Sequence, residues 1–130
     1  MKFQPDTLSG VNVITRHDPG RLWVASTPFE HSLLVPWVGE VLPWGAAQLA
    51  DLQASHFERI LALKPEVVIF GSGARLRFAP PVLMRALIEQ RVGVETMDTA
   101  AACRTYNVLA SEGRSVVAAL LLQVGTDAGT

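Results

Sequence analysis

The sequence has little cysteine: Cys103 is the single one among 130 residues. One cysteine cannot form an intrachain disulfide, and a chain without disulfides is typical of a reducing compartment. The first residues also lack the apolar stretch of a signal peptide and the Arg-rich, acid-poor composition of a transit peptide. These absences predict a cytoplasmic protein.

Long hydrophobic runs and an excess of one charge are absent as well. The longest apolar run, residues 116–122, is far shorter than the roughly 20 residues that a membrane-spanning helix needs. The 11 Lys and Arg residues nearly balance the 12 Asp and Glu residues, whereas binding to nucleic acid requires a clear surplus of cations. We therefore expect no membrane insertion and no nucleic-acid partner.

Apolar residues, by contrast, are plentiful at 49% of the chain, which is enough for a core in a single domain. Up to about residue 45 the pattern is that of short strands, expected near residues 11–15, 21–25 and 32–35. Asp18, Pro19 and Gly20 form a turn signal between the first two strands. Prolines at 28, 36 and 43 divide this β-rich part into short pieces.

After residue 45 the pattern alternates between strand and helix. Helices are expected within residues 46–63, with Ser55 as a cap, over 80–91, and over 99–112 after the N-cap Asp98. Strands are expected at 66–70, 92–97 and 116–122. A β-α-β-α-β order predicts an α/β fold with a mainly parallel sheet and helices packed on it. The predicted domain covers residues 1–124, and residues 125–130 are expected to form a flexible tail.

A glycine turn follows the most apolar strand, residues 67–70. In open α/β sheets, ligands bind beyond the carboxyl ends of strands, and glycine N–H groups can point at an anion. The third glycine of a dinucleotide fingerprint is replaced by Leu76, and a P-loop lysine is absent. Two interpretations remain open: a tight structural turn with solvated arginines, or a small-molecule site built from Gly71, Ser72, Gly73, Arg75 and Arg77.

The helix expected after Asp98 carries an unusual number of polar residues. Asn107 is a poor helix former, so its position inside the helix indicates a hydrogen bond to a group outside it. Cys103 on the same helix is expected to be a small buried residue rather than a catalytic thiol. The histidines show no metal-ligand spacing, and we expect neither a metal nor a cofactor. The helix residues assigned to a candidate ligand-binding face are Thr99, Arg104, Tyr106 and Asn107.

All three tryptophans lie in the β-rich part. Large aromatic residues fill cores, but they also anchor protein interfaces. Both interpretations remain open, and Trp37 and Trp44, which flank a proline-rich segment, are the candidates for a partner surface.

Two stretches give the sequence a family resemblance. They are residues 65–73, which contain the glycine turn, and residues 94–109 followed by Glu112, Gly113 and Arg114. Both are similar to a widespread family of unknown function that includes the archaeal MTH-type domain, a mitochondrial assembly factor of respiratory complex I and an animal protein linked to adipogenesis. The resemblance spans residues 3–122. It implies a three-layer single α/β domain with a central mixed, mostly parallel sheet and an extra N-terminal β layer.

The resemblance also implies a non-enzymatic role in assembly or interaction for at least one branch, and it supplies no catalytic residues. The sequence thus leads to two hypotheses. The first is an interaction or assembly factor with protein partners, including a second copy of itself. The alternative is a binding domain or enzyme for a small anionic molecule at the glycine turn. The second hypothesis requires the turn and the polar face of the helix to meet at one concave site.

Overall fold

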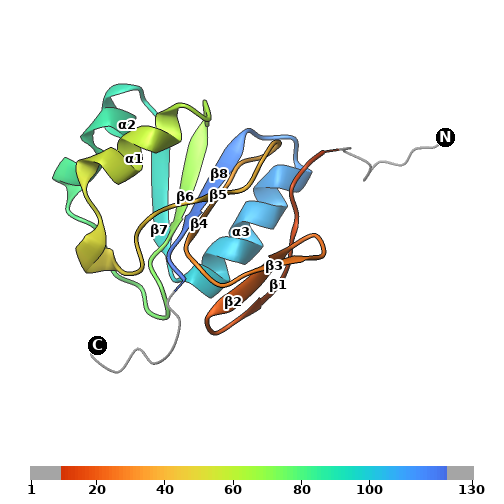
Figure 1. Cartoon of the computed structure of the whole chain (residues 1–130). Coiled ribbons are helices and arrows are strands. Elements are labelled where there is room, and N and C mark those ends of the chain that lie inside the picture. Colours follow the sequence, from red (N-terminus) through yellow and green to blue (C-terminus); the bar gives the residue numbers. More distant parts are fainter. Residues whose placement is uncertain (1–9, 123–130) are drawn as a thin grey trace.

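The computed structural model describes residues 10–122, so the predicted tail lies outside the described part. These residues form one mixed α/β domain with two sheets and three α-helices (Figure 1). The smaller sheet contains β1 (Ile14–Asp18), β2 (Arg21–Val24) and β3 (Thr27–Phe29). The larger sheet contains β4 (Leu33–Val35), β5 (Leu42–Pro43), β6 (Val67–Gly71), β7 (Gly93–Met97) and β8 (Val116–Leu120). The helices are α1 (Ala54–Leu61), α2 (Arg85–Glu89) and α3 (Thr99–Ser111), with 3-10 turns η1 (Leu49–Asp51) and η2 (Pro81–Met84).

The larger sheet is mixed, as predicted, with the strand order β5-β4-β8-β6-β7. The central strand β6 pairs in parallel with both β7 and β8. The pairs β4–β8 and β4–β5 are antiparallel. Parallel and antiparallel pairings therefore occur equally often in this sheet, and the expectation of a mostly parallel sheet was too strong. The β-rich first part causes the difference, because it adds the two antiparallel strands.

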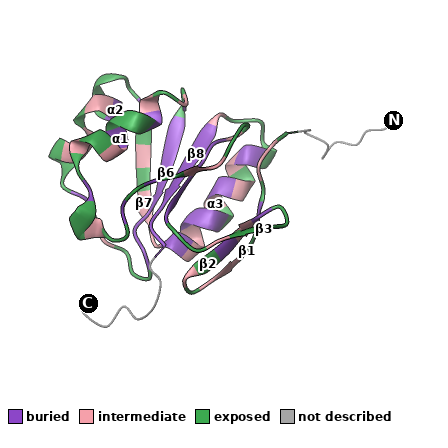
Figure 2. Ribbon diagram, in the orientation of Figure 1, coloured by how far each residue is buried: buried purple, intermediate pink, exposed green. Residues whose placement is uncertain are grey.

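Two separate cores lie on the two faces of the larger sheet. Successive side chains of a strand point to opposite faces. Along β6, Val67 and Ile69 face one core whereas Val68 and Phe70 face the other. All five residues of β6 and of β8 are buried, and for β6 this is what the apolar run at residues 66–70 predicted (Figure 2).

Helices cover both faces of this sheet. Helices α1 and α2 lie on one face, and α3 lies on the other, where the smaller sheet packs beside it (Figure 1). Helix α3 contributes Ala102, Cys103 and Tyr106 to the core that it shares with β6 and β8. The smaller sheet adds Leu22 and Val24 to the same core. This shared core holds the β1–β2 hairpin beside α3 and close to the end of β6.

The first helical region is shorter than expected. Residues 46–63 contain η1 and the eight-residue helix α1 rather than one long helix. The N-cap of α1 is Gln53, whose backbone N–H donates to His56 Nδ1 at 2.9 Å, so the prediction that Ser55 caps this helix was wrong. The second expected helix, residues 80–91, likewise divides into η2 and α2.

Two strands escaped prediction because each contains a proline. These are β3 with Pro28 and β5 with Pro43, and both lie at the edge of their sheets. Proline lacks the N–H that an interior ladder needs, and it is tolerated at an edge. The N-cap Asp98 is confirmed, since its Oδ1 accepts the Ala101 N–H at 2.9 Å.

Candidate functional site

The backbone of the glycine turn lies directly against the first residue of α3. A Cβ atom placed on Gly71 would lie 2.9 Å from Thr99 Oγ1 and 3.0 Å from the Thr99 Cα. Real Cβ atoms essentially never show contacts below 3.0 Å, so any side chain at this position would force its neighbours to shift. Gly73 is needed for a different reason, because its φ of +107° is costly for residues with a side chain.

The Thr99 hydroxyl joins the turn to the last strand. Its Oγ1 accepts the Gly73 N–H at 2.9 Å and donates to the Leu121 carbonyl at 2.8 Å. The Thr99 N–H in turn donates to the Gly73 carbonyl at 2.9 Å. Thr99 is buried, so these bonds satisfy polar groups that water does not reach.

Ser72 organises the loop that leaves the turn. Its N–H donates to the Met97 carbonyl at 2.8 Å. Its Oγ donates to the Arg75 carbonyl at 2.6 Å and accepts the Arg77 N–H at 3.0 Å. Ser72 therefore acts on the backbones of the two arginines rather than on an external ligand.

These bonds change the meaning of the predicted anion site. An anion-binding turn offers unpaired N–H groups to its ligand. Here the N–H groups of Ser72 and Gly73 already donate to Met97 and Thr99. The glycine turn joins β6, β7, α3 and the end of β8, and this structural use accounts for its residues.

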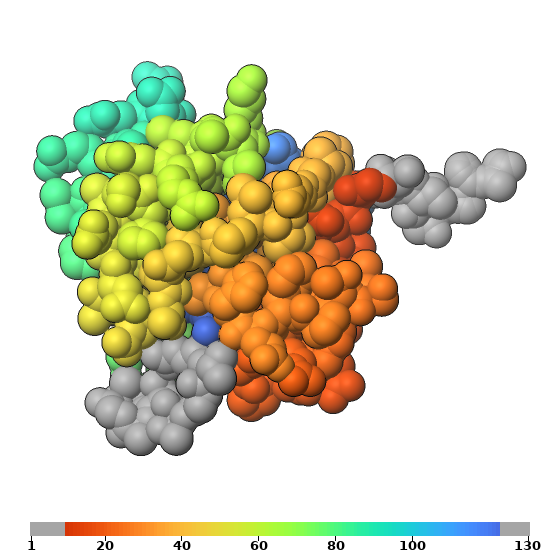
Figure 3. All heavy atoms as spheres, in the orientation of Figure 1, coloured from red at the N-terminus to blue at the C-terminus, as the bar shows by residue number. Residues whose placement is uncertain are grey.

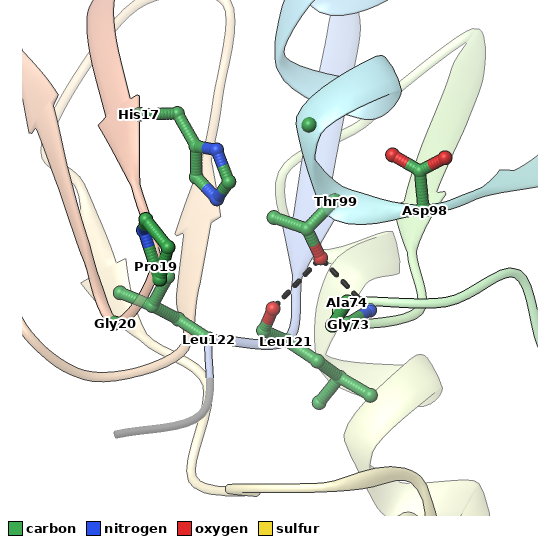
Figure 4. Close-up of a pocket in the computed structure, with 10 residues that line it drawn as sticks. His17, Pro19, Gly20, Gly73, Ala74, Asp98, Thr99, Leu121 and Leu122 are labelled. Carbon is green, nitrogen blue, oxygen red and sulfur yellow. Dashed lines mark hydrogen bonds between the residues drawn. The ribbon is translucent and has the colours of Figure 1, made fainter. Parts of the chain in front are cut away.

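A hollow of about 390 Å³ nevertheless lies beside the turn, between the β1–β2 hairpin and the start of α3 (Figure 4). It brings together Gly73 and Thr99, which the sequence assigned to a site, with residues that it did not. The full lining is His17, Pro19, Gly20, Gly73, Ala74, Asp98, Thr99, Ala100, Leu121 and Leu122. Gly71, Ser72, Arg75 and Arg77 are not part of this lining.

Two titratable side chains stand at this hollow. His17 reaches from β1 toward the start of α3, and Asp98 lies on the other side of Thr99 (Figure 4). Burial lowers the pKa of His17, and Arg104 lowers it further, whereas Asp18 and Asp98 oppose the shift. His17 is therefore neutral near pH 7, and the carboxylate of Asp98 makes the hollow unfavourable for an anion.

Two of the polar side chains of α3 that the sequence assigned to a ligand-binding face bond instead to backbone groups of the protein itself. Asn107 Oδ1 accepts the Ile14 N–H at 2.9 Å, and its Nδ2 donates to the Ile14 carbonyl at 2.7 Å. The buried Tyr106 hydroxyl lies 2.9 Å from the Asn12 carbonyl and 3.0 Å from the Pro36 carbonyl. The expectation that Asn107 bonds outside its helix is confirmed, and its partner is β1 rather than a ligand.

A second hollow, of about 370 Å³, adjoins the first along α3. It is lined by Ile14, Thr15, Arg16, His17, Ala100, Cys103, Arg104 and Asn107. Arg104 is exposed there, whereas burial raises the pKa of the Cys103 thiol to about 12. A thiol with such a pKa stays protonated at neutral pH and is a poor nucleophile.

The two tryptophans assigned to a partner surface have different positions. Trp44 is 0% exposed and packs against Phe57 and Phe70 in the core beneath α1, so its assignment to an exposed surface was wrong. Trp37 is half-buried, and its Nε1 donates to the Ala110 carbonyl at 3.1 Å. Removing the large apolar area of Trp44 from water stabilises the fold, and this gain is larger than any effect of the neighbouring prolines.

The sequence did not single out His17 as a site residue. It lies 82 positions from Thr99, and no local pattern connects them. The one sequence signal that could have pointed to His17 was the turn at residues 18–20, because the residue before a hairpin turn lies at the end of its sheet.

Over residues 10–122, no helix is long and apolar enough to cross a membrane. Within the same residues, no three His, Cys, Asp or Glu side chains lie together as metal ligands would.

Comparison with known proteins places these features in a wider group. The family model described as "Protein of unknown function (DUF498/DUF598)" matches residues 14–121. A solution structure from Bordetella pertussis, described as a Mth938-like domain, has a TM-score of 0.78 and 30% sequence identity, covering 99% of this chain and 97% of that one.

Among the curated proteins that this chain resembles, one is named as an assembly factor and another as a membrane protein. NADH dehydrogenase (ubiquinone) 1 alpha subcomplex assembly factor 3 of Bos taurus is 35% identical over 92 residues, which is 69% of this chain and 50% of the bovine protein. The chain thus spans about half the length of that relative. The "13 kDa major membrane protein" of Francisella tularensis is 26% identical over 119 residues, covering 89% of this chain and 95% of that protein.

Proposed function

Because the chain belongs to the DUF498/DUF598 family and has the Mth938-like fold, we propose that it is a non-enzymatic interaction factor that helps to assemble or stabilise a larger protein complex. The observation that carries the proposal is the internal use of residues that the sequence had assigned to a ligand site. Gly71, Ser72, Gly73 and Thr99 hold four elements together. Polar groups that are bonded inside the fold in this way are not available to a ligand, which favours an interaction role over ligand chemistry at this turn.

Exposed apolar side chains support the proposal. Four of the seven large hydrophobic residues that the described surface exposes lie between positions 76 and 88. Phe78, with 69% of its surface exposed, is the most open of them. In the space-filling view this segment reaches the surface at the left edge, in green and teal (Figure 3). A contiguous apolar patch is typical of a surface that a partner covers, and we infer that these four side chains contribute to one.

The relative named as an assembly factor gives the proposal its direction. By analogy with that protein, the partner of this chain is a component or precursor of a multisubunit complex, and respiratory complex I is the first candidate. We place this activity in the cytoplasm. Because one relative is named as a membrane protein, the alternative location to test is the membrane surface.

The test is affinity purification of the tagged chain from its own host, followed by native mass spectrometry of the eluate. We expect a defined protein complex with the wild-type chain and loss of the partner with Phe78→Ser. Val108→Ser is the matched control, because Val108 is also exposed but lies on α3. If the wild-type chain elutes alone under gentle conditions, the proposal is wrong.

A second candidate function is the binding of a small molecule in the hollow beside the glycine turn. The observation that favours it is the meeting of Gly73 and Thr99 with His17 in one cavity of about 390 Å³. Isothermal titration with inorganic phosphate tests the anionic version of this candidate. Binding that disappears in His17→Ala and strengthens in Asp98→Asn supports the anionic version, whereas the absence of heat with phosphate removes that version.

A further inference from the structure

Strand β7 is an open edge of the larger sheet. It has five residues, contains no proline, and pairs with β6 without a break in register. Natural sheets protect their edges with short strands, prolines, bulges or covering groups, because an open edge pairs with other chains. The described part of the chain uses these devices elsewhere and not at β7.

The other edges illustrate the contrast. Strand β5 has two residues and includes Pro43, and β3 has three residues and includes Pro28. Strand β1 has an irregular register near Ile14, whose N–H and carbonyl are both bonded to Asn107. At β7, the protection is of another kind and consists of one charged residue, Glu95.

The hydrogen-bond pattern identifies the open groups of β7. The Met97 carbonyl accepts the Ser72 N–H, so the backbone groups of Met97 face β6. Backbone groups alternate in direction along a strand, and those of Glu95 consequently face β6 as well. The N–H and carbonyl groups of Val94 and Thr96 therefore point away from the sheet, where an added strand would bond to them.

The two faces beside this edge differ in chemistry. On the side of α2, a groove of about 450 Å³ runs along the strand, and Ile88, which is 59% exposed, stands in its wall. The groove is lined by Pro81, Met84, Ile88, Arg91, Val92, Gly93 and Val94. Glu95 is exposed and, one residue on from Val94, points to the opposite face. An incoming strand would place alternate side chains in an apolar groove and beside a carboxylate.

A second copy of this chain fits the edge poorly. In a two-fold antiparallel pair that uses both Val94 and Thr96, each Val94 bonds to the partner strand's residue 96. This register sets the two Glu95 residues directly opposite each other, and like charges directly opposite destabilise a strand pair.

We propose that the β7 edge binds an extended segment of a different protein, which adds a strand to the sheet, places an apolar side chain in the groove and sets a lysine or arginine beside Glu95. This inference rests on the proposed function and specifies the kind of partner. Backbone bonds to Val94 and Thr96 supply the affinity, and the groove and Glu95 supply the specificity, as in other cases of strand addition.

The direct test uses a seven-residue peptide of alternating lysine and valine as the probe. We expect the peptide to slow hydrogen exchange at the Val94 and Thr96 amides. Thr96→Pro removes one outward N–H and is expected to weaken binding about tenfold, whereas Thr96→Ala keeps that N–H and should bind as before. Glu95→Lys should weaken binding of this peptide and favour a glutamate–valine counterpart. A peptide of the same composition with its lysines in one block is the control for nonspecific attraction.

Protection elsewhere, equal binding of the block peptide, or equal binding by Thr96→Pro overturns the proposal. Purification of the protein from its host shows whether the edge proposal alone fails or the proposed function fails with it. If wild type and Thr96→Pro recover the same partner equally, the edge proposal is wrong and the proposed function stands. If wild type recovers none, both are wrong. If the wild-type chain forms dimers that Thr96→Pro abolishes, the occupant is a second copy, and the proposal is also overturned.

Discussion

Gly71 and Thr99 approach each other so closely that a methyl group on the glycine would lie 2.9 Å from the threonine hydroxyl oxygen. The contact brings the end of β6 against the first turn of α3, and it leaves the Thr99 hydroxyl in place to bond Gly73 and Leu121. Two residues separated by 28 positions thus define how strand and helix pack.

Substitution of Gly71 by alanine should be costly. The added methyl group would meet the side chain of Leu120 and both the side chain and the Cα of Thr99, and the Thr99 Cα cannot move without shifting α3. We expect Gly71→Ala to lower the free energy of unfolding by about 2 kcal/mol, measured by urea denaturation. Gly93→Ala is the matched control, since nothing lies within 4 Å of its added Cβ, and it should change stability by less than about 0.5 kcal/mol. Equal effects of the two substitutions would contradict this assignment.

Loss of the Thr99 hydroxyl should leave two buried groups without partners. Thr99→Val keeps the shape but offers nothing to the Gly73 N–H or the Leu121 carbonyl. We expect a loss of about 3 kcal/mol, the cost of leaving both groups unsatisfied. Thr99→Ser retains the hydroxyl and should lose clearly less. If valine and serine are equivalent in thermal and urea unfolding, the two hydrogen bonds do not stabilise the fold.

Asn107 should hold the first hairpin to α3. Asn107→Ala removes both bonds to the Ile14 backbone, and we expect about 2 kcal/mol of destabilisation together with faster hydrogen exchange at the Ile14 amide. Arg104→Ala, on an exposed position of the same helix, is the control and should change stability by less than about 0.5 kcal/mol. Unchanged exchange at Ile14 in Asn107→Ala would show that the hairpin is held by other contacts.

The stability of the protein should fall as the pH drops below about 6.5 because of His17. Burial lowers the folded-state pKa of this histidine below its ordinary value of about 6.5. The unfolded chain therefore takes up a proton first, and the free energy of unfolding decreases with pH until the folded-state pKa is passed. His17→Gln should weaken this dependence in melting curves recorded between pH 8 and pH 5. An identical slope in both proteins would mean that other groups cause the acid sensitivity.

Sequence reasoning worked well for the second half of the chain and less well for the first. The strands β6 and β8 and the Asp98 cap follow from local patterns, and each was confirmed. The family resemblance was confirmed as well. Strands β3 and β5 were missed because proline disfavours a strand locally, while the position at a sheet edge, which makes it acceptable, depends on the tertiary fold.

The candidate site was harder to predict than the fold. Glycines and a threonine at strand and helix ends are common to binding turns and to tightly packed turns. What separates these uses is the partner of each N–H group, and those partners lie far away along the chain. Asn107 shows the same difficulty, since its bonds reach Ile14 across 93 positions.

The alternation of side chains along β6 and β8 has an evolutionary consequence. Ile69 and Phe70 are neighbours in the chain, yet they belong to different cores. A change in volume at Ile69 calls for compensation on the side of α3, for example at Leu120, and a change at Phe70 calls for it at Phe57, on the other side. A change in volume on one face of the sheet can therefore be accommodated without a change on the other, so that the two cores can accept substitutions independently.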